Sequence, residues 1–214
     1  MTLSIHNKQF WMSNAIIVAS LLAAAFFPTE NAIQSLISDS VFLVILPIFF
    51  VKFLLKGDLS EYGFSLGKML RGSLWMIVLL SGIVAGLAAV IHYTDILARF
   101  AVPLSIRVSF LMFLLYLFVT GVYIFIFEFF FRGFVFFVWE KFGGMKAIAM
   151  QTLLFMLFLV AGSHGKVDIL FLIAIAMAVF SGFLVAQSRS IVYSFLFSYI
   201  SAILGIASAV LFVK

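Results

Sequence analysis

The chain has 214 residues, of which 66% are hydrophobic and only 10% are charged, and its mean hydropathy is +1.31. A soluble domain of this size does not need so much apolar surface, so the composition predicts a polytopic membrane protein. The net charge of +5 comes from basic residues spread along the loops, which argues against a nucleic-acid-binding patch. The absence of cysteine excludes a disulfide framework, a thiol nucleophile and thiolate metal sites.

Apolar runs of about 17–25 residues predict an all-α transmembrane helical bundle of about seven spans. The spans are expected at Trp11–Phe27, Val41–Leu55, Met69–Ile91, Val108–Phe131, Ala147–Ala161, Ile169–Ala186 and Ile191–Val213. The first run resembles a signal peptide, and we interpret it as a retained helix. The fourth is expected to continue as helix towards Trp139, because nothing breaks it before Gly143. The fifth is short, which leaves a tilted, half-buried or re-entrant segment open.

The basic residues of the loops predict the orientation in the membrane. Counted over alternate loops, one side collects Lys8, Lys56, Lys68, Arg71, Lys141, Lys146 and Arg189, and the other collects Arg99, Arg107, Lys166 and Lys214. Because cytoplasmic loops carry the excess of basic residues, the N-terminus is expected in the cytoplasm and the C-terminus outside an inner (plasma) membrane. The loop before Val41 holds Glu30 and Asp39 and no basic residue.

An acid and a base, Glu128 and Arg132, interrupt the fourth span, and no other charged residue lies between Val108 and Trp139. A charge at the bilayer centre costs roughly 2.5–3.5 kcal/mol on insertion scales, so both are expected to be paired or functional. At i,i+4 with the acid first, the two side chains can meet on one helix face. Two interpretations stay open at this point: a self-neutralising pair that lets the helix sit in the membrane, or part of a functional site.

Three further features are assigned to simpler roles. Gly82 and Gly86 form a GxxxG motif in the third span, which we interpret as close packing within the bundle. The segment Gly57–Lys68 is expected to be an interfacial turn or a short amphipathic helix. His164 falls in a short loop on the side opposite Arg132, where a solvated histidine is more common than a catalytic one.

The order of these motifs resembles one known family. The run Glu61–Gly67 precedes a span, Glu128 and Arg132 lie late in the next, and Arg189-Ser190-Ile191 opens the last. This order resembles the CPBP family of intramembrane proteases (CAAX protease and bacteriocin-processing, also called Abi). The resemblance implies a single all-helical membrane domain, 1–214, with two N-terminal spans in 1–56, a CPBP/Abi-like core in 57–202 and the end of the last span in 203–214.

The resemblance also implies a signature in three parts: Glu-Glu-xxx-Arg, then Phe-xxx-His, then His-xxx-Asn or Asp. In that family a carboxylate activates water, histidines share the task or hold a metal, and a polar group stabilises the oxyanion. In this chain the second Glu is Glu128 and the Arg is Arg132. The first Glu, which the family uses as the base, falls on Phe127.

The other two parts of the signature are not matched. Phe155 matches the phenylalanine of the second part, but its histidine falls on Leu159. In the third part the histidine falls on Ser198 and the polar residue on Ala202. The base, both histidines and the oxyanion group are therefore missing together, and the former site is expected to be apolar and dry. Glu128 is then expected to bond to Arg132 and to a hydroxyl such as that of Ser198.

Three functions from different classes stay open. The favoured one is a proteolytically inactive family member, a pseudoprotease that acts in the bilayer as a scaffold or regulator, with a membrane-protein partner or a second copy, no nucleic acid and no cofactor. The second is a divergent active endopeptidase, CAAX-type or bacteriocin-processing, that uses Glu128 as its base with Ser198 or His164 assisting; only this alternative requires zinc. The third is a small subunit of a membrane transport complex.

Overall fold

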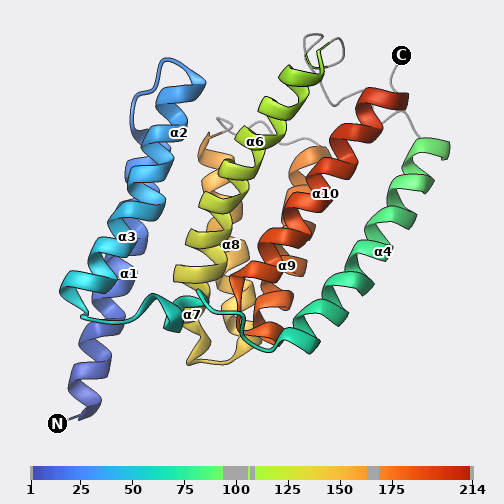
Figure 1. Cartoon of the computed structure of the whole chain (residues 1–214). Helices are drawn as coiled ribbons and strands as arrows, with labels where there is room; N and C mark the ends of the chain where they lie inside the picture. Colours follow the sequence, from blue (N-terminus) through green and yellow to red (C-terminus); the bar gives the residue numbers. More distant parts are fainter. Residues whose placement is uncertain (1, 94–105, 107–108, 163–168, 213–214) are drawn as a thin grey trace.

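The computed structural model describes residues 2–93, 106, 109–162 and 169–212, which are helical over most of their length (Figure 1). Seven helical segments in these ranges are long and apolar enough to span a membrane, which confirms the predicted all-α bundle. In chain order the elements are α1 (Thr2–Phe26), α2 (Ala32–Ser40), η1 (Val41–Ile45), α3 (Leu46–Phe49), η2 (Phe50–Leu54), η3 (Leu59–Tyr62), α4 (Met69–Tyr93), α6 (Phe110–Phe127), η5 (Glu128–Val135), α7 (Phe136–Glu140), α8 (Gly144–Gly162), α9 (Ile169–Ser188) and α10 (Ile191–Phe212). The elements η1, η2 and η5 are π-helical, and η3 is a 3₁₀ turn.

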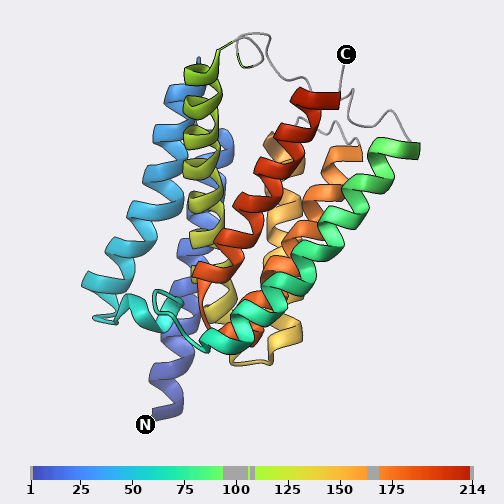
Figure 2. The same cartoon turned by 45° about the vertical axis from the view of Figure 1, so that its right-hand side comes forward.

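The helices form one bundle in which α1 and the α2–η2 segment stand on one side and α4 stands at the opposite edge (Figures 1 and 2). Helix α8 packs against α9, and α10 packs against both α4 and α9. The segment α6–η5 runs through the middle, and every residue of η5 is buried. Phe130, Phe131 and Phe134 of η5 contact buried residues of α1, η1, η2, α8 and α9, so the hydrophobic core is centred on η5.

The prediction for the start of the second span was wrong. The helix begins at Ala32 instead of Val41, because the Asn31 side chain caps it by accepting hydrogen bonds from Ile33 N at 3.1 Å and Gln34 N at 3.0 Å. Asp39, which was placed in the preceding loop, is therefore helical and only 7% exposed. The charge of Asp39 was interpreted as a loop signal, but the N-cap and the apolar residues around it outweigh that signal.

The fourth span follows the prediction, and the fifth is longer than predicted. Helix α6 continues without a break through η5 and α7 to Glu140, and the turn that follows contains Gly143 at φ +111°, as expected for a glycine that ends a helix. The fifth span is not short: α8 has 19 residues, because Gly144, Met145 and Lys146 are helical although they precede the apolar run. Such a helix is about 28 Å long at 1.5 Å per residue, close to the thickness of a bilayer core.

The connection between η2 and α4 is a structured turn that contains η3, and the predicted position of residues 57–68 at the membrane interface stays a prediction. Asp58 caps η3 by accepting a hydrogen bond from Ser60 N at 3.1 Å. The turn is tied to the α9–α10 junction by two backbone hydrogen bonds, from Ile191 N to the Gly63 carbonyl at 3.1 Å and from Lys68 N to the Ser188 carbonyl at 2.6 Å. This connection therefore positions the starts of α4 and α10 relative to each other.

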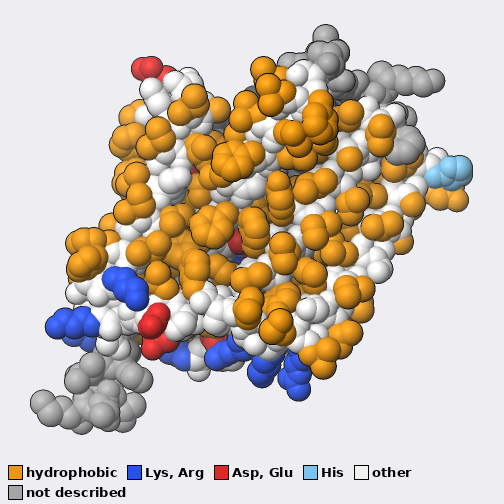
Figure 3. Space-filling view, in the orientation of Figure 1, with side chains coloured by type: hydrophobic (Ala, Val, Ile, Leu, Met, Phe, Trp, Pro, Cys, Tyr) orange, Lys and Arg blue, Asp and Glu red, His pale blue; other side chains and the backbone are white. Residues whose placement is uncertain are grey.

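The alternation of the spans agrees with the predicted loop sides. In Figure 1 the start of α1, the end of η2, the start of α4 and the α7–α8 and α9–α10 turns lie at the lower end. The α1–α2 turn and the end of α10 lie at the upper end, and Figure 3 shows most of the visible Lys and Arg side chains at the lower end. The basic loops thus share one end of the bundle, while the side of the membrane that this end faces stays a prediction.

The GxxxG motif does not pack against any of the described residues. A Cβ atom added at Gly82 or Gly86 of α4 would meet no atom within 4 Å. The glycine of α4 that does pack is Gly72, where an added Cβ would lie 2.5 Å from Cδ2 of Tyr193 on α10. The sequence pattern therefore indicated the right helix but the wrong glycines for the α4–α10 contact.

These two kinds of glycine lead to opposite expectations for alanine substitution. Gly72→Ala should lower the free energy of unfolding by about 1–3 kcal/mol, because the buried Tyr193 ring would have to move. Gly82→Ala, in the same helix, should be neutral or raise it by about 0.5–1 kcal/mol through helix propensity alone. Unfolding in mixed detergent micelles checks both, and equal effects of the two variants would contradict the packing described here.

Candidate functional site

The centre of the bundle holds a polar cluster on an otherwise apolar core. Glu128 is the first residue of η5 and Arg132 lies one turn later on the same helical segment, and each is only 3% exposed. Arg132 Nε lies 3.7 Å from Glu128 Oε1, which makes an ion pair but is too long for a hydrogen bond. The guanidinium carbon of Arg132 lies 4.9 Å from the centroid of the Phe155 ring on α8. The arginine is therefore held between the carboxylate and an aromatic face.

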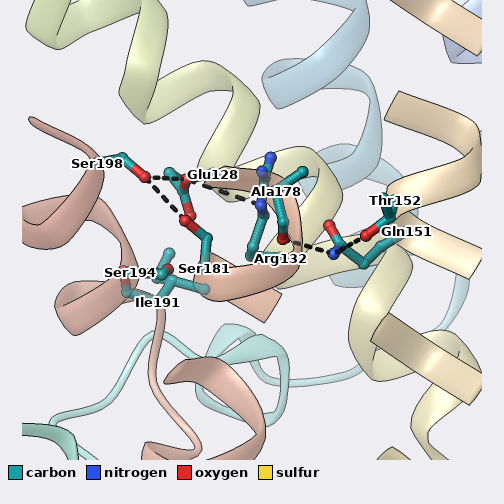
Figure 4. A network of polar contacts seen from close by, with 9 residues as sticks. All are labelled: Glu128, Arg132, Gln151, Thr152, Ala178, Ser181, Ile191, Ser194 and Ser198. Carbon is teal, nitrogen blue, oxygen red and sulfur yellow. Dashed lines mark hydrogen bonds and ion pairs between the residues drawn. The ribbon is translucent and has the colours of Figure 1, made fainter. Parts of the chain in front are cut away.

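Two serines connect Glu128 to the neighbouring helices. Ser198 Oγ of α10 donates a hydrogen bond of 2.8 Å to Glu128 Oε1, and Ser181 Oγ of α9 lies 2.9 Å from Ser198 Oγ (Figure 4). A hydroxyl has one proton, so when Ser198 donates to the carboxylate, Ser181 must donate to Ser198. The predicted contacts of Glu128 with Arg132 and Ser198 are thus present, and the chain of hydroxyls fastens η5 to α9 and α10.

A second polar group beside this cluster was missed in the sequence analysis. Gln151 of α8 is fully buried, and its Nε2 donates to Thr152 Oγ1 at 2.8 Å and to the Ala178 carbonyl of α9 at 2.9 Å. A Cβ atom at Gly182 would lie 2.6 Å from this nitrogen, so the glycine leaves the space that Gln151 occupies. The sequence carries a signal for this contact, because an amide inside an apolar span needs a hydrogen-bond partner.

Three buried polar atoms of the cluster have no hydrogen-bond partner among the described residues: Glu128 Oε2, Arg132 Nε and Gln151 Oε1. An unsatisfied buried polar atom costs about 1–3 kcal/mol, so these atoms are suited to binding water or a polar ligand group.

Two of the degenerate signature positions, Phe127 and Leu159, have apolar surroundings. The Phe127 ring lies 5.8 Å from the Phe158 ring and 6.1 Å from the Phe155 ring, centroid to centroid, both on α8. Leu159 is half-buried and packs against the core centred on η5. Ala202 is half-buried one turn beyond Ser198 on α10, and His164 lies outside the described residues.

The described residues around Glu128 do not fit a zinc ion. Zinc in proteins takes histidine, cysteine and carboxylate ligands, usually three or four of them. No group of at least three His, Cys, Asp or Glu side chains comes together in the part of the chain that the structure describes. Next to Glu128, the positions that the family signature gives to ligands hold a phenyl ring, an isobutyl group and a hydroxyl, at Phe127, Leu159 and Ser198. The expectation that no cofactor is bound itself stays a prediction.

The fold and the site define a helical, multi-pass membrane protein with a buried Glu–Arg pair on its central helix. A protein-family model described as "Type II CAAX prenyl endopeptidase Rce1-like" matches residues 106–204, which include α6 to most of α10 and all of the polar cluster. This match agrees with the resemblance to CAAX-protease-like membrane proteins that the sequence indicated. Comparison with curated proteins and with solved structures finds no match for the chain. The proposed core of 57–202 begins before the matched segment, and that division stays a prediction.

Proposed function

We propose that the chain is a proteolytically inactive CAAX-protease-like protein that acts as a scaffold or regulator of another membrane protein. The observation that carries this proposal is the pairing of Glu128 Oε1 with both Arg132 and Ser198 while Phe127 stands where the family has its base. A carboxylate that already contacts a guanidinium and a hydroxyl through one oxygen has a structural role and is poorly suited to act as a base. It stabilises the junction of η5, α9 and α10.

The environment of the pair supports the same proposal. Peptide hydrolysis needs a water molecule held next to a base and next to groups that stabilise the oxyanion. Phe127 lies in an aromatic cluster with Phe155 and Phe158, which offers a water no hydrogen bond. The outer surface supports a role in binding, because α4 and α6 expose many large apolar side chains to lipid or to a partner's helix. We place the basic end of the bundle, with the N-terminus, on the cytoplasmic side of an inner membrane.

One observation favours a second candidate, an active intramembrane endopeptidase. Glu128 Oε2 has no hydrogen-bond partner among the described residues, so this oxygen is free to accept a hydrogen bond from water. Under this alternative Oε2 would be the proton acceptor and Ser198 would position the carboxylate through Oε1. The first candidate gives the Glu128 carboxylate no part in catalysis, whereas the second makes it the catalytic base.

A cleavage assay separates the two candidates. Purified wild-type protein in lipid nanodiscs is incubated with a prenylated CAAX peptide, and the products are analysed by mass spectrometry beside the Glu128→Gln variant. We expect no product from either protein, because the wild type already has no competent base. The variant keeps an oxygen that can accept the hydrogen bond from Ser198. Cleavage by wild type that is lost in Glu128→Gln would overturn the proposal, as would stoichiometric zinc in the purified protein by elemental analysis.

The scaffold role has a readout of its own. Purification from native membranes in mild detergent should recover a membrane-protein partner in stoichiometric amount. Arg132→Met should lower that yield, because it disturbs the helix junction, whereas the exposed Lys146→Met should not. Recovery of wild type as a lone monomer in every detergent would contradict the proposed role.

A further inference from the structure

A partly polar pocket of about 230 Å³ opens where α1, η3 and α7 meet, at the end of the bundle that carries most of the basic loops. Gln9, Glu61, Tyr62 and Lys141 supply its polar groups, and Phe10 is among its apolar walls. The pocket lies away from the Glu128 cluster and shares no residue with it. Nothing in the proposed function uses it.

The walls of this pocket are held in place by specific contacts. Trp139 Nε1 of α7 donates a hydrogen bond of 3.0 Å to Asn14 Oδ1 of α1, which fixes the two helices next to each other. Lys141, directly after α7, places its Nζ 3.7 Å from the centroid of the Phe10 ring on α1. The ammonium group is therefore oriented over the pocket wall before any ligand binds.

The pocket carries one positive and one negative side chain that do not neutralise each other. Among the described residues, neither Glu61 nor Lys141 takes part in an ion pair. The negative charge of Glu61 contributes, after burial, to raising the pKa of Tyr62, so the carboxylate is close to that wall. Opposite charges that share a pocket without meeting can be bridged by a ligand that carries both signs.

The position of the pocket corresponds to the headgroup region of a bilayer. It lies at helix ends, after η2 and α7, and near Trp11, which is 66% exposed. Tryptophan and tyrosine concentrate at this level in membrane proteins, and basic residues lie just beyond it. Figure 3 shows basic and acidic side chains together at this end of an otherwise apolar surface.

We propose that this pocket binds the headgroup of a zwitterionic, primary-amine phospholipid, phosphatidylethanolamine. The lipid phosphate pairs with Lys141, and the ethanolamine ammonium donates hydrogen bonds to Glu61. A phosphatidylglycerol headgroup satisfies the lysine but leaves the carboxylate facing a second anion. A phosphatidylcholine headgroup has no N–H to donate to the carboxylate.

Native mass spectrometry of the detergent-purified full chain tests this proposal, with phosphatidylethanolamine, phosphatidylglycerol and phosphatidylcholine of identical acyl chains added in turn. We expect wild type to retain phosphatidylethanolamine in preference to both others. Lys141→Met should weaken its retention by about fivefold, the scale of one partly exposed charge contact. Glu61→Gln should remove the preference over phosphatidylglycerol. Lys146→Met and Glu30→Gln change the same charges outside the pocket and should have no effect.

Several outcomes would overturn the lipid assignment. Equal retention of the three lipids by wild type would overturn it. Equal losses of phosphatidylethanolamine retention in Lys141→Met and Lys146→Met would also overturn it. Displacement of the lipid by soluble phosphoethanolamine at equal concentration would assign the pocket to a soluble ligand instead. Glu61 and Lys141 are exposed, so both variants should elute like wild type in size-exclusion chromatography.

Discussion

Replacement of Arg132 by methionine should lower the free energy of unfolding by about 3–5 kcal/mol, because it leaves Glu128 as an unpaired charge in the core. Both side chains are 4% exposed, so water cannot take over the role of the guanidinium. Methionine fills the space of the aliphatic part of the arginine side chain but not that of the guanidinium group over the Phe155 ring. Most of the expected loss therefore comes from the unpaired charge, and the rest from the space left by the guanidinium group.

A double variant separates the charge effect from other causes. Glu128→Gln together with Arg132→Met removes both charges and retains an oxygen that can accept the hydrogen bond from Ser198. It should recover most of the stability lost in the single variant, because replacing a buried pair as a whole is far less costly than breaking it. The coupling between the two positions is read from the four proteins of this double-mutant cycle.

The surface pair of Lys52 and Asp58 is a matched control for this experiment. Its charged atoms are 3.7 Å apart, the same distance as in the buried pair, but the side chains are 43% and 68% exposed. Lys52→Met should change the stability far less than Arg132→Met, because solvent screens such a pair. Unfolding is followed in mixed micelles of a mild detergent and dodecyl sulfate. The buried-pair interpretation fails if Arg132→Met costs no more than Lys52→Met.

Substitution of Gly67 by alanine should be nearly as damaging, with a loss of about 2–5 kcal/mol from backbone strain and steric overlap together. Gly67 has φ +52°, and a Cβ atom there would lie 2.1 Å from the Ser188 carbonyl oxygen. The same oxygen accepts the hydrogen bond from Lys68 N. The alanine methyl group would therefore push the η2–α4 connection away from the α9–α10 junction.

Gly143 provides the control for the strain component alone. It has φ +111°, but an added Cβ would meet no atom within 4 Å. Gly143→Ala should therefore cost only the conformational strain, about 1–2 kcal/mol. Protease accessibility of the 57–68 connection, measured beside the unfolding curve, should rise in Gly67→Ala and stay at the wild-type level in Gly143→Ala. Equal accessibility in the two variants would show that the Ser188 contact does not hold this connection.

The helical spans and the central ion pair were predictable because each rests on a local rule. The bilayer demands long apolar helices, so the spans appear as apolar runs and only their ends are uncertain. Glu128 and Arg132 are four residues apart on one continuous helix, and their meeting follows from that spacing. The contact with Ser198 was predictable only through the family signature, which aligns α10 with the central helix.

Other features depend on contacts between helices that are distant in the chain. Asp39 is buried because an N-cap at Asn31 extends its helix, and a charge count alone could not show this. Gly72, not Gly82 or Gly86, approaches α10, and which glycine faces a neighbouring helix depends on how the whole helices pack. The amide of Gln151 in an apolar span predicts a hydrogen-bond partner, but only the packing of α8 against α9 shows that this partner is the Ala178 carbonyl.

Composition and local spacing were sufficient to predict a membrane-spanning helical bundle with one acid–base pair in its central span, and the family resemblance added an incomplete protease signature. The packing of α8, α9 and α10 around η5 decided the rest: which hydroxyls reach Glu128, which oxygen of its carboxylate stays free, and that Gln151 lies beside the pair. The physical reason is that the free energy of transferring a span from water to lipid is a sum over its own residues, which the sequence gives directly. Partners inside the bundle are selected by the relative positions of whole helices, to which each residue contributes little.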